Sequence, residues 1–167
     1  MERIKQRERS YSWGNPLEGV TLSAALSGME YLQAIQRGEA PASPLVNTLD
    51  FSLGELEEGK VSFYFEPQEF HYNPNGSVHG GVITSILDSA MGCALHTLLP
   101  AGTGYTTLEL KVNFLKKAVI GSGLLTATGS IIHLGKSTAL VEASLTDENG
   151  KKYAHAVSTC MVLKSKI

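Results

Sequence analysis

The sequence predicts an α+β protein in which an antiparallel sheet of about six strands packs against one long helix, with a short helix near the N-terminus. Two observations support this fold class. Segments of alternating apolar and polar residues, typical of half-buried strands, are joined by short turns that favour antiparallel hairpins. Between the second and third of these segments, an apolar run at residues 80–98 has helical spacing. A single helix placed in this way must lie across one face of the sheet.

The N-terminal part of the chain divides into an arm and the beginning of the domain. Residues 1–20 are polar, charged and rich in turn-forming residues, and they predict an arm that is loosely held or docked on a partner. Residues 21–167 are predicted to form one domain. Within it, apolar residues at helical spacing predict a short amphipathic helix from Ser23 to Arg37. Pro41 and Pro44 then predict an extended connector.

The predicted strands form two groups, one on each side of the long helix. Before it, residues 46–56 predict one strand and residues 61–65 its hairpin partner. After it, the alternation over residues 107–114 predicts that Leu108 and Leu110 face the core while Thr107 faces away. The last three strands are expected at residues 124–134, 138–146 and 153–163, joined by the turns Gly135-Lys136 and Asp147–Gly150.

Composition and charge exclude several classes of protein. The chain has 167 residues, is 43% hydrophobic and carries a formal net charge of -2, which gives no electrostatic footprint for nucleic acid. Cys93 and Cys160 lie in apolar segments and are predicted to be small buried hydrophobes. None of the five histidines has the spacing of a metal site, so no metal is predicted. The first ten residues lack the apolar core of a signal peptide, and a cytoplasmic protein is expected.

Asp88 stands within the apolar helix and is the first candidate for chemistry. Its charge argues against a membrane-spanning helix, and a buried carboxylate is costly unless it is paired, hydrogen-bonded or protonated. One interpretation is structural, with Asp88 hydrogen-bonded to a neighbouring hydroxyl such as Thr84 or Ser85. The other is catalytic. Gly80 and Gly81 begin the same helix, and their bare N–H groups at its positive end are suited to bind a ligand oxygen.

These residues resemble those of a known family. Asn73, Gly76, His79-Gly80-Gly81 and then Asp88, set between a strand pair and a run of antiparallel strands, resemble the motif of the hotdog-fold thioesterases. The likeness is closest to the PaaI-like branch, which acts in phenylacetic acid degradation, and it extends over most of the chain. The resemblance implies a hotdog fold, in which the sheet wraps around the central helix. It also implies an acyl-CoA thioesterase that needs no cofactor.

The resemblance also implies roles for individual residues. The amide of Gly80, helped by Asn73, would bind the thioester carbonyl oxygen. Asp88 of a second subunit would activate water or act as nucleophile, with Thr107 placing the water. His79 would hold the loop in place.

The substrate and the assembly are further expectations from the same resemblance. Gly81 would contribute to substrate binding, and the turn containing Lys136 and Ser137 would lie near the CoA nucleotide, although an ordinary solvated lysine is the alternative. A homodimer or homotetramer with shared sites is expected, with no nucleic acid or membrane partner. Two other functions remain open, a non-catalytic acyl-CoA-binding module and an enoyl-thioester hydratase. The acyl group itself is not specified.

Overall fold

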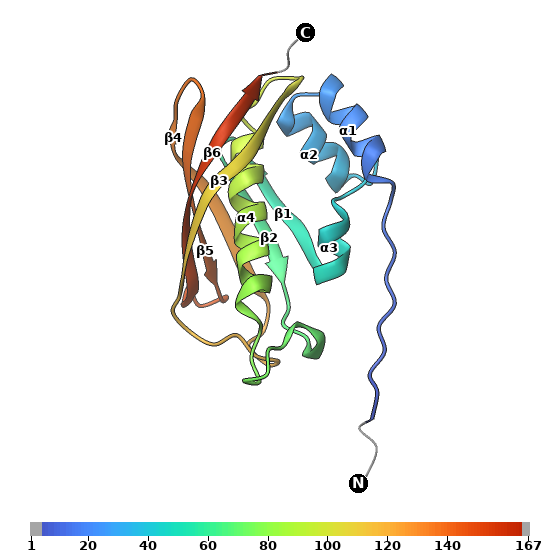
Figure 1. Cartoon of the computed structure of the whole chain (residues 1–167), viewed down its shortest axis with the longest axis vertical. Coiled ribbons are helices and arrows are strands. Elements are labelled where there is room, and N and C mark those ends of the chain that lie inside the picture. Colours follow the sequence, from blue (N-terminus) through green and yellow to red (C-terminus); the bar gives the residue numbers. More distant parts are fainter. Residues whose placement is uncertain (1–4, 165–167) are drawn as a thin grey trace.

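A computed structural model describes residues 5–164, with the side chain of residue 164 left out. A single sheet of six antiparallel strands in the order β1-β2-β4-β5-β6-β3 packs against the long helix α4 (Figure 1). The elements, in chain order, are α1 (Pro16–Ala25), α2 (Gly28–Gln36), α3 (Pro44–Leu49), β1 (Phe51–Glu57), β2 (Lys60–Phe65), the 3-10 turn η1 (Glu69–His71), α4 (Gly80–His96), β3 (Thr103–Phe114), β4 (Leu125–Leu134), β5 (Thr138–Thr146) and β6 (Lys152–Lys164). The predicted α+β class and the hotdog arrangement of sheet and helix are confirmed.

Helix α4 is the centre of the core. Ile86, Leu87 and Met91 are fully buried against the inner face of the sheet. The helix comes very close to β4 at Gly129, where a Cβ atom would collide with the backbone of Ala90 in α4. Only glycine allows the helix backbone to lie directly on the strand, and this contact sets the depth at which α4 sits.

The edge strand β3 departs from the predicted alternation. It pairs with β6, but the register shifts between Thr107 and Glu109, so that Leu108 forms a bulge. Leu108 is consequently 54% exposed, and the prediction that it faces the core is wrong. Because a bulge adds one residue, the side chains on the helix side change from odd to even numbers along the strand. Thr107 and Leu110 therefore both face α4, where a regular strand would have placed them on opposite faces.

The N-terminal region is more helical than predicted. The single helix expected from Ser23 to Arg37 is two helices, because Ser27 accepts from Glu30 N and forms a capping box that starts α2 anew. The expected boundary between arm and domain at residue 20 falls inside α1. That helix begins at Pro16, and the Asn15 side chain caps it by accepting from Leu17 N.

The predicted strand from residue 46 to residue 56 is also corrected. Its first part belongs to α3, which begins at Pro44, where a proline at the first helical position is favourable. The helix ends at Asp50, whose φ of 53° is left-handed, and β1 then starts at Phe51. The apolar spacing of Val46 and Leu49 fits a short helix as well as a strand, and Pro44 decides between them.

The three N-terminal helices lie on the side of α4 away from β4 and β5, so that α4 is enclosed between two layers (Figure 1). The segment before α1 is extended and docks on its own chain through Arg9. The Arg9 guanidinium donates to the carbonyl oxygens of Asn47 and Thr48 at the end of α3 and stacks on the ring of Phe70. The predicted arm is thus anchored on α3 and η1 of its own chain.

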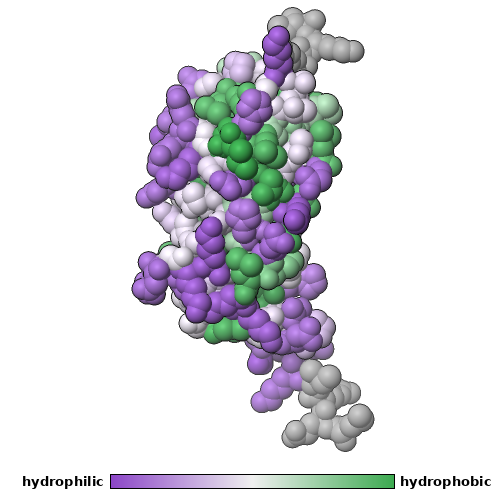
Figure 2. Space-filling view, turned by 90° about the vertical axis from the view of Figure 1, so that its left-hand side faces the viewer, coloured by the Kyte–Doolittle hydropathy of each residue, from purple (hydrophilic) through white to green (hydrophobic). Residues whose placement is uncertain are grey.

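The outer face of the sheet carries apolar side chains among polar ones (Figure 2). Exposed apolar residues of β5 and β6 include Leu140, Met161 and Leu163. None of the helices between residues 5 and 164 combines the length and the apolar character needed to span a bilayer.

Candidate active site

The loop before α4 is held in one shape by Asn73. Its Oδ1 accepts from the backbone N–H groups of Asn75 and Ser77 at 2.9 and 3.4 Å, and its Nδ2 donates to Ser77 Oγ at 3.3 Å. The end of the loop is tied to the domain, since Val78 N donates to Ala118 O and His79 N to His71 O. Asn73 thus stabilises the segment that leads into Gly80, and it lies beside Gly80 in a shallow cavity of about 350 Å³.

The sequence suggested that the backbone N–H groups of both Gly80 and Gly81 would be free at the start of α4, but within the described part of the chain only one of them is. His79 is the N-cap, and its Nδ1 accepts from Gly81 N at 2.9 Å. The Gly81 N–H is therefore already bonded, and the expectation of a bare pair of N–H groups is corrected. The Gly80 N–H has no acceptor among the described residues. A Cβ atom at Gly80 would approach the Phe114 ring to 3.0 Å, so the ring covers one side of this turn.

Asp88 is half-buried in the middle of α4, and it is hydrogen-bonded across to the sheet. Thr107 Oγ1 donates to Asp88 Oδ1 at 2.9 Å. The neighbouring hydroxyls that a structural interpretation would pair with Asp88 are occupied elsewhere. Thr84 Oγ1 donates to Gly80 O at 2.8 Å and Ser85 Oγ to Gly81 O at 2.9 Å. Asp88 therefore keeps carboxylate surface facing a cavity, with a hydroxyl from β3 fixing its orientation.

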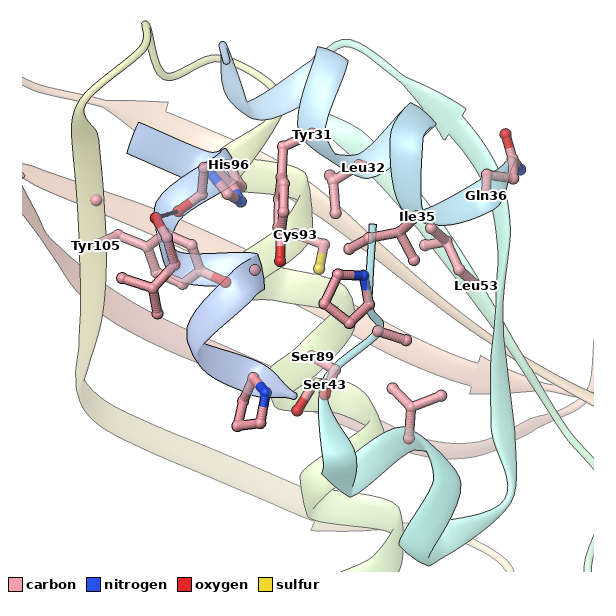
Figure 3. Close-up of a pocket in the computed structure, with 18 of the residues that line it drawn as sticks. Tyr31, Leu32, Ile35, Gln36, Ser43, Leu53, Ser89, Cys93, His96 and Tyr105 are labelled. Carbon is pink, nitrogen blue, oxygen red and sulfur yellow. Dashed lines mark hydrogen bonds between the residues drawn. The ribbon is translucent and has the colours of Figure 1, made fainter. Parts of the chain in front are cut away.

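The cavity beside Asp88 is large. It has a volume of about 900 Å³ and lies between α4, the N-terminal helices and β1. Figure 3 shows Tyr31 extending from α2 into this space toward Cys93, with His96 and Tyr105 beside it. The His96 ring lies 5.8 Å from that of Tyr31 and 5.6 Å from that of Tyr105. These three rings therefore give the cavity an aromatic wall.

Burial shifts the pKa values of Cys93, Tyr105 and His96 in this cavity toward the neutral forms of these groups. Burial raises the pKa of the Cys93 thiol to about 12 and, with a smaller effect of Asp88, disfavours a thiolate there. Burial raises the pKa of Tyr105 well above its usual value, and burial lowers the pKa of His96. With Cys93 and Tyr105 protonated and His96 uncharged near neutral pH, Asp88 is the one carboxylate among the residues lining this cavity.

In one chain, Gly80 and Asp88 do not meet. They are eight positions apart in α4, which corresponds to about 12 Å along the helix axis. They also line different cavities, Gly80 the smaller one and Asp88 the larger one. The predicted site residues therefore form two clusters, with Asn73, His79, Gly80 and Gly81 at the start of α4 and Asp88 with Thr107 near its middle.

Lys136 and Ser137 lie apart from both clusters. They are exposed in the turn between β4 and β5. Leu125 at the start of β4 pairs with Phe65, next to the loop that leads to α4, whereas Leu134 pairs with Ala139 beside this turn. The turn is thus at the other end of the sheet from Gly80 (Figure 1), and a role in CoA binding stays a prediction. Over residues 5–164, no three His, Cys, Asp or Glu side chains cluster in a way that would hold a metal ion.

Sequence reasoning missed the contribution of the N-terminal helices. Gly19 of α1, Tyr31 and Ile35 of α2 and Val46 of α3 all line the larger cavity. The spacing of Tyr31 and Ile35 showed an apolar helix face, but periodicity within a helix does not reveal which surface that face meets. Nothing in the sequence indicated that this apolar face of α2 would not pack fully against α4 and would leave a cavity between the two helices.

Comparisons with known proteins agree with the fold. The sequence model of the thioesterase superfamily matches residues 75–154, a segment that contains Gly80, Asp88 and Thr107. The 1,4-dihydroxy-2-naphthoyl-CoA hydrolase of Listeria monocytogenes is 31% identical over 122 residues, which cover 73% of this chain and 96% of that protein.

Solved structures of two proteins connected with phenylacetic acid degradation have a similar fold. A phenylacetic acid degradation-related protein of Ralstonia eutropha is 28% identical, with a TM-score of 0.71 over 78% of this chain and 98% of its own. The PaaI protein of E. coli, from the phenylacetic acid degradation operon, shares the fold at 22% identity. Its TM-score is 0.69, over 81% of this chain and 94% of its own. The likeness predicted from the motif is confirmed.

Proposed function

Because the chain belongs to the thioesterase superfamily of hotdog-fold hydrolases, we propose that it hydrolyses acyl-CoA thioesters at a site shared by two copies of the chain. The observation that carries the proposal is the 2.9 Å hydrogen bond from Thr107 to Asp88, which orients a carboxylate at the edge of a large cavity. The Listeria relative is a CoA-thioester hydrolase by name, which supports the same chemistry here.

In this proposal, Asp88 is the general base. It takes a proton from water as the water oxygen attacks the thioester carbonyl carbon. Thr107 donates its hydroxyl proton to Asp88, so its oxygen lone pairs remain available to accept from the same water. General-base catalysis of this kind contributes about 10²–10⁴-fold in rate. The tetrahedral intermediate then expels the CoA sulfur, which leaves with the proton, and the products are the free acid and CoA.

The Gly80 amide would bind the carbonyl oxygen as its negative charge develops. Its N–H is unpaired in the described chain and lies at the positive end of a 17-residue helix. One preorganised donor of this type typically contributes about 3–4 kcal/mol to transition-state stabilisation. Asn73 and His79 would act by holding the loop and the first turn in place. No cofactor enters this reaction beyond the CoA of the substrate.

The separation of Gly80 from Asp88 within one chain supports a shared site. A second copy would bring its own Gly80 to Asp88, and each dimer would then contain two equivalent sites, as two-fold symmetry requires. The exposed edge strand β3, which carries Thr107 and the exposed apolar residue Leu108, is the element we propose at this contact. An unpaired strand edge of this length is suited to continue a sheet across two chains.

The first test removes the base. Asp88→Asn and Asp88→Ala should lower kcat by at least about 100-fold in a thiol-release assay over a panel of acyl-CoAs, because general-base catalysis is lost. Melting curves and size-exclusion chromatography check that fold and assembly are unchanged, and Glu55→Gln, an exposed carboxylate on β1, is the matched control. Turnover close to wild type in the folded Asp88 variants would refute the mechanism. Stable acyl-CoA binding without thiol release by the wild type would favour a binding module instead.

The second test removes the amide donor. Gly80→Pro deletes the N–H at the first helical position, where proline fits the helix, and Gly80→Ala adds a Cβ against Phe114 but keeps the N–H. The proline variant should lose far more activity than the alanine variant.

Mixing the two inactive variants, Gly80→Pro and Asp88→Asn, then tests the shared site. Random subunit exchange should restore about a quarter of wild-type activity, since half of the dimers are mixed and each mixed dimer has one intact site. No recovery after demonstrated exchange would refute sharing.

A further inference from the structure

The side of α4 that faces the N-terminal helices differs in character from the side that faces the sheet. Ser89, which comes directly after Asp88, is followed by Cys93 and His96 at spacings of four and three residues, so these three residues form one stripe along the helix. All three line the 900 Å³ cavity, whereas Leu87 and Met91 on the sheet side are fully buried. Along the helix axis, His96 at the end of this stripe lies about 12 Å from Asp88, at 1.5 Å per residue. Asp88 therefore lies at one end of an elongated space.

The opposite wall of this space is made by residues that precede the segment matched by the thioesterase superfamily. Gly19 is a buried residue of α1, and a Cβ atom there would meet the Tyr31 hydroxyl at 2.7 Å. Tyr31 in turn packs against His96, at the end of the stripe away from Asp88. The contact between Gly19 and Tyr31 thus closes the cavity on the side of α1, where a side chain larger than glycine would displace the tyrosine.

We propose that this cavity holds the acyl group of the thioester, and that Gly19 and Tyr31 determine which acyl groups fit. The inference rests on the proposed function, because the thioester carbonyl must lie near Asp88. Within the same chain, the space that Asp88 lines is the large cavity between α4 and the N-terminal helices (Figure 3), and the acyl group would enter it.

The size and lining of the cavity point to a bulky, largely apolar acyl group. Ligand sites of about 300–1,000 Å³ enclose drug-sized molecules, whereas an acetyl group extends only one C–C bond of about 1.5 Å beyond the carbonyl. Leu32, Ile35 and Phe63 provide apolar walls, and the Tyr31 and Tyr105 rings add aromatic surface to the lining. Burial raises the pKa of Tyr31, so its hydroxyl stays neutral and does not introduce a charge into this lining.

The experiment compares one large substitution on two faces of α1. Gly19→Leu places an isobutyl group against Tyr31 inside the cavity, whereas Thr21→Leu adds the same group to the exposed face of the helix. The assay measures kcat/KM for acetyl-, butyryl-, hexanoyl- and phenylacetyl-CoA. One misplaced methylene in an apolar pocket changes the rate by about 10–200-fold. The value of kcat/KM for hexanoyl- or phenylacetyl-CoA, divided by the value for the shortest thioester that is hydrolysed, is the selectivity ratio. Gly19→Leu should therefore lower this ratio by at least about tenfold. Thr21→Leu should leave that ratio unchanged.

A second variant covers the case in which Gly19→Leu fails to fold. Tyr31→Ala enlarges the same end of the cavity, so it should raise kcat/KM for the larger thioesters relative to the shortest one. A melting curve checks that the variant is folded. An unchanged ratio in the folded variants, with all thioesters affected equally, would overturn the assignment of the cavity while leaving the thioesterase function intact. If the wild type releases thiol from none of the thioesters, the proposed function itself fails. The two failures are therefore distinguishable.

Discussion

The hydrogen bond between Thr107 and Asp88 offers the sharpest test of the catalytic geometry. Thr107→Val keeps the shape and the β-branched packing of the side chain but removes the hydroxyl that donates to Asp88 Oδ1 at 2.9 Å. The expected result is a lower kcat with little change in KM, because the hydroxyl orients the base and the water and is not expected to bind the CoA part of the substrate.

The size of the expected fall in kcat follows from the charge of Asp88, which accepts the hydrogen bond. A hydrogen bond to a charged group contributes about 1.5–3 kcal/mol, and each 1.36 kcal/mol corresponds to a tenfold change in rate. If the bond is fully used in the transition state, kcat should fall by about 10- to 150-fold. Because Asp88 is only half-buried, solvent partly replaces the lost donor, and the lower half of this range is expected.

Two further variants make the result specific. Thr107→Ser keeps the hydroxyl but loses the methyl group that restricts its rotamer, so it should recover most but not all of the activity. Thr106→Val makes the same chemical change one residue earlier, on the exposed side of β3, and should leave kcat unchanged. Thiol release under saturating substrate and a melting curve for each variant provide the measurements. A folded Thr107→Val enzyme with kcat within about twofold of wild type would refute the positioning role.

Two other predictions concern the scaffold. His71 is 2% exposed, accepts from Gln68 N through Nδ1 and contacts Leu49 O through Nε2, and burial lowers its pKa below the usual 6.5. As the pH falls, His71 therefore binds a proton in the unfolded chain before it does so in the folded protein. The stability that neutral His71 contributes is present above about pH 6.5, and it is lost as the pH falls toward the pKa of His71 in the folded state. His71→Gln should lower the melting temperature at pH 7.5 and flatten its fall between pH 6.5 and 5; an equally steep fall would contradict this assignment. Gly129→Ala should lower the free energy of unfolding by about 1–3 kcal/mol, because the added Cβ has no room against the backbone of α4. Each kcal/mol corresponds to a fall of about 2–4 °C in melting temperature. Gly104→Ala, in a strand position with open space, is the control and should change little.

The parts of the fold that could be predicted are those set by local periodicity. Alternation placed β2, and residue type with the turns Gly135-Lys136 and Asp147–Gly150 placed β4, β5 and β6, all within one or two residues of their observed bounds. The long helix was recognisable from its apolar spacing, and its start from the His79-Gly80-Gly81 motif. Asp88 could be singled out because a carboxylate in an apolar helix is costly without a partner. The partner itself, Thr107, was implied only by the resemblance to a known family.

The bulge at Leu108 shows why residue pattern alone did not place Thr107 toward Asp88. Strict alternation over residues 107–114 predicts Thr107 on the face opposite to Leu110. The extra residue at Leu108 reverses the alternation, so that both side chains lie on the helix side. A bulge depends on the pairing with β6, and the partner of Thr107 on that strand, Cys160, is more than forty residues away in the sequence. Bulges of this kind are frequent next to active sites, and a strand pattern gives little sign of them.

The two faces of α4 explain how one helix can serve as both core and site. On the sheet side, the missing side chain of Gly129 lets the α4 backbone rest on β4, and Ile86, Leu87 and Met91 fill the space around this contact. A helix held so firmly on one side does not need its other side closely packed to stay in place. The side with Ser89, Cys93 and His96 can therefore face a cavity while Asp88 keeps a fixed position relative to Thr107. Substitutions around Gly129 should therefore lower activity as well as stability, because they move the carboxylate relative to the hydroxyl that orients it. Substitutions in α1 should instead change the choice of acyl group and leave the alignment of Asp88 intact.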